Sequence, residues 1–207
     1  MVIAAVIVIV VTSRGGNNPA TTTAAASTAL TGPAGPEGID LEEGDVLAPA
    51  SAAATGATVD GIQCNSAEQA VYHIHTHLSI FVNGSLRPVP GGIGVVHPVA
   101  QQTPQGPFYG ADTCYYWLHT HAQDGIIHVE APSQTTYTLG QFFGIWQQQL
   151  SSSAIGSNTG KVTAYVNGKA YAGNPASIPL KSHEDVQLDL GSPTVAPKTI
   201  DWSKAQL

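Results

Sequence analysis

Histidine is concentrated in two short stretches of the chain, where its spacing could support metal chemistry. It occurs at alternate positions in "YHIHTH" (residues 72–77) and again in "HTHAQDGIIHVE" (residues 119–130). Alternate residues on a β-strand point to the same face, with Cα atoms roughly 6.6–6.8 Å apart. Two imidazoles at that spacing can bind one ion. The candidate metal ligands are His73, His75, His77, His119, His121 and His128.

The spacing within the first stretch limits how its histidines can be shared. His73 and His77 lie roughly 13 Å apart on a regular strand, so both should not reach one ion. The stretch therefore supplies one ligand pair and a spare, or one ligand to each of two sites. The competing interpretation is a polar sheet face on which histidine is merely frequent. Because imidazoles crowded on one face repel as they protonate, we favour metal binding. His97 and His183 are predicted to be loop residues.

The ligand types restrict which metal such a site would hold. Imidazole suits zinc and copper, whereas Cu(I) is preferentially bound by thiolate and thioether ligands. The only methionine is Met1, so Zn(II) or Cu(II) fits better than Cu(I). Asp124 and Glu130 are candidates to orient an imidazole through its second nitrogen. Glu130 could alternatively be a ligand, or a general base beside a metal-bound water.

Alternation of apolar residues predicts that the first histidine stretch lies on a β-strand. Over residues 72–82 the even positions are apolar except for Thr76, and the odd positions carry the histidines. The "NG" that follows is typical of a tight hairpin turn. Further strands are expected at residues 92–96, 114–121 and 125–130, and later in "KVTAYV" and "DVQLDL".

One amphipathic helix is expected in "TLGQFFGIWQQQL" (residues 138–150). Thr138 and Gln141 have the spacing of a capping box at its start. Its large apolar residues recur at helical spacing and are expected in the core. The whole pattern predicts a mainly β domain, an antiparallel sandwich or barrel with one packed helix.

Composition and cysteine usage favour a protein outside the cytoplasm. Only 10% of the residues are charged, the net charge is −7, and seven Lys and Arg residues are scattered along the chain. No basic face for nucleic acid is therefore expected. Cys64 and Cys114 are predicted to form a disulfide, as is usual in exported proteins. The alternative is a free Cys114 thiolate near His119.

The sequence divides into three parts. Residues 1–11, from Met1 to Val11, are uninterrupted apolar sequence and would cover about half of a bilayer core. They are expected to be a membrane anchor or an assembly helix, with a cleaved leader as the alternative. Residues 12–60 are rich in Ala, Thr, Ser, Gly and Pro and predict an extended tether. Residues 61–207 are expected to form the histidine-rich β domain.

Several metal-binding families share short strings with the chain but differ in the rest of their ligand pattern. Cupins, copper–zinc superoxide dismutases, alpha carbonic anhydrases and cupredoxins each match one string without the expected later ligands. The combination of an HxHxH strand, "HTHxxxGIIHVE" and "TLGQFF" resembles uncharacterised exported prokaryotic proteins over residues 72–190. The resemblance implies a shared fold and histidine site and carries no activity.

Three functional hypotheses follow from these patterns. The first is an anchored extracytoplasmic protein that holds Zn(II) or Cu(II) through the clustered histidines. The second is a structural subunit of a filament or membrane assembly, built through residues 1–11. The third is a metal-dependent hydrolase, in which Glu130 or a histidine activates water; enzymatic activity is the less favoured interpretation. No substrate is indicated by the sequence.

Overall fold

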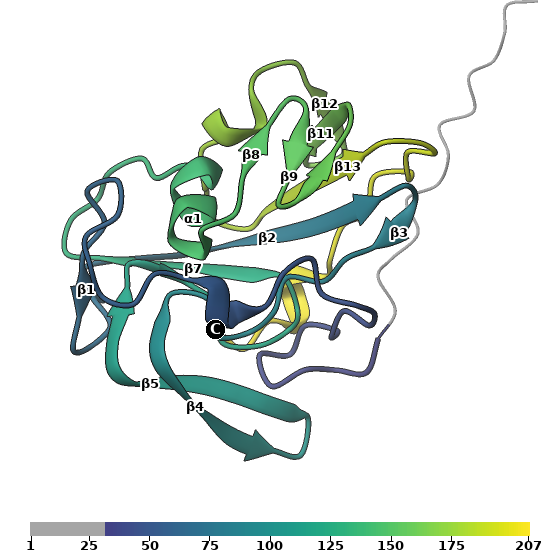
Figure 1. Ribbon diagram of the computed structural model, residues 1–207. Helices are drawn as coiled ribbons and strands as arrows, with labels where there is room; N and C mark the ends of the chain where they lie inside the picture. Colours follow the sequence, from purple (N-terminus) through teal and green to yellow (C-terminus); the bar gives the residue numbers. More distant parts are fainter. Residues whose placement is uncertain (1–31) are drawn as a thin grey trace, which may run out of the picture.

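The computed structural model describes residues 32–207, and the fold is mainly β with a single α-helix among these residues (Figure 1). The largest sheet has the strand order β12-β11-β13-β2-β7-β6, with β3 paired to β2. Its strands are β2 (Tyr72–Val82), β3 (Ser85–Leu86), β6 (Leu118–His119), β7 (Ile126–Ala131), β11 (Val162–Val166), β12 (Lys169–Tyr171) and β13 (Glu184–Leu190).

Two smaller antiparallel sheets and the helix complete the domain. Their strands are β1 (Cys64–Asn65), β4 (Val95–Thr103) and β5 (Gly106–Tyr116) in one sheet, and β8 (Leu150–Ser151), β9 (Ala154–Ile155) and β10 (Asn158–Thr159) in the other. The helices are α1 (Leu139–Trp146) and the short 3-10 helices η1 (Ala50–Ala52), η2 (Pro175–Ser177) and η3 (Trp202–Lys204).

The predicted mainly β fold with one packed helix is confirmed. Among the described residues, all strand pairs are antiparallel except β2 with β13, which run parallel. The main sheet is open, because its strand order runs from β12 to β6 without closing. The capping box at Thr138 and Gln141 is present, but α1 ends at Trp146 because Gln147 adopts a left-handed conformation with φ 55°. The end of the predicted helix instead contributes to β8.

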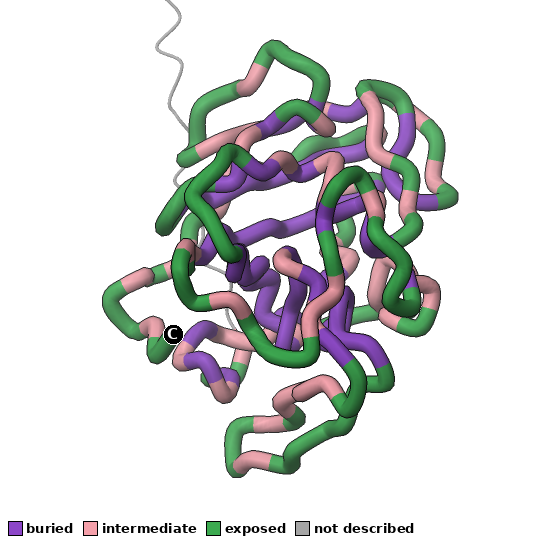
Figure 2. Tube along the Cα trace, turned by 90° about the vertical axis from the view of Figure 1, so that its left-hand side faces the viewer, coloured by how far each residue is buried: buried purple, intermediate pink, exposed green. Residues whose placement is uncertain are grey.

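The two faces of the main sheet differ in character. One face packs into the hydrophobic core with α1, which contributes Phe142 and Trp146. On β2 this face carries Leu78 and Ile80, and the alternating residues His77 and Ser79 point to the opposite face. That opposite face is polar but is also buried. Figure 2 shows the buried stretches of the chain gathered in the middle of the domain. Polar groups on it therefore need partners from the segments that cover it.

Two irregular segments cover the polar face. The first, residues 32–44, contributes buried acidic side chains at Glu37 and Glu42. The second, residues 191–207, supplies backbone N–H groups to the side chains of β13: Val195 donates to Asp189, and Ile200 donates to Asp185. The segments are joined by a hydrogen bond from the Gln206 N–H to the Glu37 carbonyl, 2.8 Å long.

Residues 32–60 belong to the folded domain, which corrects this part of the predicted tether. Ile39 and Ala54 are buried, and the Ala54 N–H donates to the Ile145 carbonyl of α1. The composition of the segment predicted a tether, but a few buried apolar side chains and backbone hydrogen bonds hold it to the domain. The predicted anchor at residues 1–11 and the tether at residues 12–31 lie outside the described residues. Within residues 32–207, no helix is long and apolar enough to cross a membrane.

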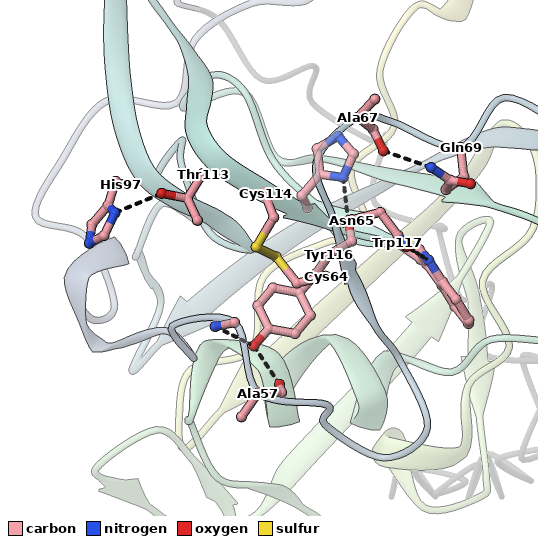
Figure 3. Close-up of a disulfide and its surroundings, with 12 residues drawn as sticks. Ala57, Cys64, Asn65, Ala67, Gln69, His97, Thr113, Cys114, Tyr116 and Trp117 are labelled. Carbon is pink, nitrogen blue, oxygen red and sulfur yellow. Dashed lines mark hydrogen bonds between the residues drawn. A yellow bond between two sulfur atoms is a disulfide. The ribbon is translucent and has the colours of Figure 1, made fainter.

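The predicted disulfide between Cys64 and Cys114 is confirmed (Figure 3). It joins β1 to β5, whose residues pair antiparallel at this point. Next to it the Tyr116 hydroxyl donates to the Ala57 carbonyl, and the Trp117 indole donates to Asn65. The disulfide therefore fixes the segment before β2 onto the base of the long β4–β5 hairpin. The hairpin itself projects from the domain, and most of its residues are exposed or half-buried (Figures 1 and 2).

Removing this disulfide is expected to destabilise the domain strongly. The bond joins residues 50 positions apart, and the chain-entropy estimate for a loop of that size is about 4 kcal/mol. Urea unfolding of a Cys64→Ala, Cys114→Ala variant, followed by circular dichroism, should show a loss of this order. An unfolding midpoint equal to that of the wild type would contradict a stabilising role for the bond.

Candidate metal centre

Three neighbouring strands bring the histidines together in register. His75 on β2 pairs with His128 on β7, and His128 pairs in turn with His119 on β6. In the next row, His73 pairs with Glu130. Residues that are directly opposite in adjacent strands have their Cβ atoms about 4.5–5.5 Å apart. The two histidine stretches, which contain the predicted candidate ligands, therefore lie side by side.

His119 and His121 present two lone pairs to each other. The Nδ1–H of His119 donates to the Tyr116 carbonyl at 2.8 Å, and that of His121 donates to the Tyr109 carbonyl at 2.7 Å. Because a carbonyl oxygen can only accept, both Nδ1 atoms carry the hydrogen, and in a neutral imidazole Nε2 is then an acceptor. The two Nε2 atoms nevertheless lie 3.1 Å apart. Two acceptors at that distance repel unless a cation lies between them.

A proton is a poor candidate for that cation. Burial, together with the neighbouring charge of His121, holds the pKa of His119 well below its usual value. Burial, with the charge of His128, lowers the pKa of His121 to about 4. Both rings are therefore neutral near pH 7, as metal ligands must be.

His73 and His75 form a second close pair, with their Nε2 atoms 3.0 Å apart. No backbone carbonyl fixes the tautomer of these two rings among the described residues, so one Nε2–H can donate to the other ring when no metal is bound. Burial is the main reason why the pKa of His75 is lowered to about 3, and the charges of His128 and His73 act in the same direction. His73 has 41% of its side chain exposed, so this pair lies at the solvent side of the cluster, whereas His119 is fully buried.

His128 and Glu130 lie between the two pairs. The ring of His128 is centred 4.5 Å from that of His75 and 4.6 Å from that of His121. The Oε1 atom of Glu130 is 3.0 Å from His73 Nε2, 3.3 Å from His128 Nδ1 and 4.0 Å from His119 Nε2. The shared residues thus place an imidazole and a carboxylate within reach of either histidine pair.

Glu37 fixes the orientation of His128. Its carboxylate lies 2.6 Å from His128 Nε2, which leaves Nδ1 directed toward Glu130. Although burial alone would lower it, hydrogen bonds to Glu130 and Glu37 raise the pKa of His128 to about 9. Against the effect of its own burial, the hydrogen bond to His128 lowers the pKa of Glu37. Without a metal, a proton on Nδ1 therefore balances the two carboxylates, and an ion bound there would displace it.

Within residues 32–207, two overlapping groups of side chains are geometrically able to bind a metal ion. Within each group, one ligand atom from every residue lies within 4.8 Å of those from the others. The first group is His73, His75, His128 and Glu130, and the second is His119, His121, His128 and Glu130. These groups contain all but one of the histidines expected as ligands and also include Glu130.

The remaining predicted ligand, His77, lies apart from the cluster. It is buried between Glu42, with Nε2 to Oε1 at 3.7 Å, and Asp185, with Nδ1 to Oδ1 at 3.5 Å. The separation from His73 agrees with the strand spacing that excludes a shared ion. His183 lies in a turn, as expected for a loop residue, whereas His97 lies on β4 at a bulge.

The sequence interpretation did not include three acidic residues that contact the histidines: Glu37, Glu42 and Glu68. Glu68 Oε1 lies 3.5 Å from His121 Nε2 at the solvent side. Glu37 and Glu42 come from a stretch that was assigned to the tether. Within this stretch, "EGIDLEEGD" combines several acidic residues with Ile39 and Leu41. That combination differs from the rest of the predicted tether and was a signal that the stretch could pack against the domain. Asp124 is buried beside Glu37, and its Oδ1 accepts from the Ile126 N–H.

Comparison of the chain with known protein families, curated proteins and solved structures finds no match. The resemblance to uncharacterised exported proteins therefore stays a prediction.

Proposed function

We propose that this protein is an extracytoplasmic metal-binding protein that holds Zn(II) or Cu(II) at the histidine cluster. The observation that supports this most strongly is the close approach of two Nε2 lone pairs, 3.1 Å apart, on the buried and neutral rings of His119 and His121. Nitrogens bound to a tetrahedral zinc at the usual 2.0–2.1 Å would be roughly 3.3 Å apart. The pair is thus close to the spacing that an ion requires.

The ligand set favours a d-block ion of intermediate softness. The cluster offers imidazole nitrogens and carboxylate oxygens, a combination that suits zinc and copper(II). Calcium and magnesium prefer sites made of oxygen alone. The carbonyl groups of Tyr116 and Tyr109 and the carboxylate of Glu37 hold the nitrogens that face away from the ion. Such partners are usual for metal-binding histidines.

The disulfide supports the extracytoplasmic part of the proposal, because such bonds persist in non-reducing compartments. The proposal also includes attachment to a membrane or to a cell-surface assembly through residues 1–11. Fractionation of cells that express the full chain, beside a variant without residues 1–11, tests it. Release of the shortened chain into the soluble extracytoplasmic fraction is expected. Identical partitioning of both forms would contradict attachment.

Elemental analysis of protein purified without added metal tests metal binding itself. At least one zinc or copper per chain is expected, and a His119→Ala, His121→Ala variant should lose the buried ion. His97→Asn is a matched control, because His97 is exposed on β4 with φ 51°, a conformation that asparagine tolerates. A wild-type protein that contains no metal and takes up none would contradict the proposal.

Glu37 is expected to strengthen metal binding without being a ligand. A Glu37→Gln variant keeps the shape of the side chain but lacks the negative charge that orients His128. Loss of such a partner typically weakens metal affinity 10–100-fold. Competition with a chromogenic chelator measures the change, and Glu43→Gln, on an exposed neighbour, is the control. Unchanged affinity in Glu37→Gln would show that His128 is not bound to the ion.

A further inference from the structure

We propose that the cluster holds two metal ions, one at each histidine pair, with the Glu130 carboxylate bridging them. This inference rests on the proposed metal-binding function and adds the number of ions and their arrangement. The described residues form two groups of potential ligands, each with its own histidine pair. His73 and His75 belong to one group only, and so do His119 and His121.

Each pair has the geometry of an independent two-nitrogen site. The Nε2 atoms are 3.0 Å apart in His73 and His75 and 3.1 Å apart in His119 and His121. His73 and His75 lie on β2, whereas His119 ends β6 and His121 follows it. Because β2 and β6 flank β7, the two pairs approach the shared residues from opposite sides. One ion would have to bind all four imidazoles to use both pairs, whereas two ions need only one pair each.

Glu130 is placed to bridge the two positions. Its Oε1 lies 3.0 Å from His73 Nε2 and 4.0 Å from His119 Nε2, one nitrogen from each pair. Two-metal sites in proteins commonly hold their ions about 3.5–4 Å apart, a separation that one carboxylate can span. His128, centred almost equally far from His75 and His121, supplies Nδ1 as a further ligand.

The two ions should differ in how fast they exchange. The ion at His119 and His121 is the more enclosed of the two, since these side chains are almost completely buried, although the half-exposed Glu68 lies 3.5 Å from His121 Nε2. The ion at His73 and His75 lies at the surface, where His73 has 41% of its side chain exposed. A chelator is therefore expected to remove the outer ion first, and water can complete its coordination.

The test is the number of ions bound per chain in the full-length protein. After loading with Cu(II) or Zn(II) and removal of free ion, elemental analysis should give two ions for the wild type and for the His97→Asn control. It should give one ion for a His73→Ala, His75→Ala variant. With Cu(II), electron paramagnetic resonance of the wild type should show two coupled spins. The His73→Ala, His75→Ala variant should show the ordinary signal of one isolated copper.

The outcomes separate this inference from the proposed function. One ion in the wild type, with an uncoupled copper signal, would overturn the two-ion arrangement but leave metal binding intact. Two ions without spin coupling in the wild type would overturn the bridge. No ion at all would overturn both. Because the wild-type stoichiometry and signal need no substitution, the test does not depend on the folding of any variant.

Discussion

Loading the purified domain with Zn(II) or Cu(II) is expected to raise its thermal stability substantially. An ion that binds only the folded state stabilises it by about 4 kcal/mol when the free ion is 1,000-fold above Kd. For a domain of this size, that corresponds to a shift in Tm of roughly 8–16 °C. The expected cause is relief of the repulsion between the buried Nε2 atoms of His119 and His121.

Calorimetry with and without a chelator measures this shift. The His97→Asn control should show the full effect, and the His119→Ala, His121→Ala variant should lose most of it. In the metal-free state the same variant should be less stable than the wild type, because it leaves a cavity and removes the donors to the Tyr116 and Tyr109 carbonyls. The quantity to compare is therefore the metal-induced shift within each protein. Equal Tm values for metal-loaded and metal-free wild type would contradict metal binding by the folded state.

The second large effect concerns Glu42, which is buried against His77 away from the metal ligands. Burial raises the pKa of Glu42 from 4.5 to about 7, against the opposing effects of His77 and of a backbone hydrogen bond from Val89. Asp185 faces the other nitrogen of His77. Between these pKa values the folded state holds a proton that the unfolded state has lost. The free energy of unfolding therefore falls as the pH rises through this window.

A Glu42→Gln variant should not show this fall in the free energy of unfolding with rising pH. At about 1.4 kcal/mol per pKa unit, the variant is expected to gain up to about 3 kcal/mol over the wild type above pH 7. The difference should vanish near pH 4, where the wild-type carboxyl is protonated in both states. Urea unfolding of metal-free protein between pH 4 and 8 measures it, with Glu43→Gln, an exposed neighbour, as the control. A difference that does not change with pH would show that Glu42 does not titrate in this window.

Much of the local structure was predictable because it depends on periodicity. The alternation around His73 and His75 identified β2 and its polar face, and the capping box at Thr138 identified the start of α1. The end of α1 was less predictable, since it depends on the left-handed conformation of Gln147. Nothing in the strand pattern indicated that β13 would pair parallel to β2, because such pairing is set by distant segments.

The candidate site was predictable in its histidines but not in its acidic residues. Two-residue spacing determines which imidazoles share a face, and it also separates His77 from His73. Glu37, by contrast, lies 91 positions from His128 in the sequence and reaches it through an irregular segment. The composition of this segment resembles that of a tether. Its position in the fold depends on backbone hydrogen bonds such as that between Gln206 and Glu37. Long-range contacts of this kind leave no periodic signal.

The measurement that tests the central claim most directly is anomalous diffraction from metal-loaded crystals at the zinc or copper absorption edge. The proposed function predicts a peak between the rings of His119 and His121, about 2.0–2.1 Å from each Nε2 for zinc. A map with no anomalous peak between these two nitrogens, from crystals grown with excess metal, would contradict it.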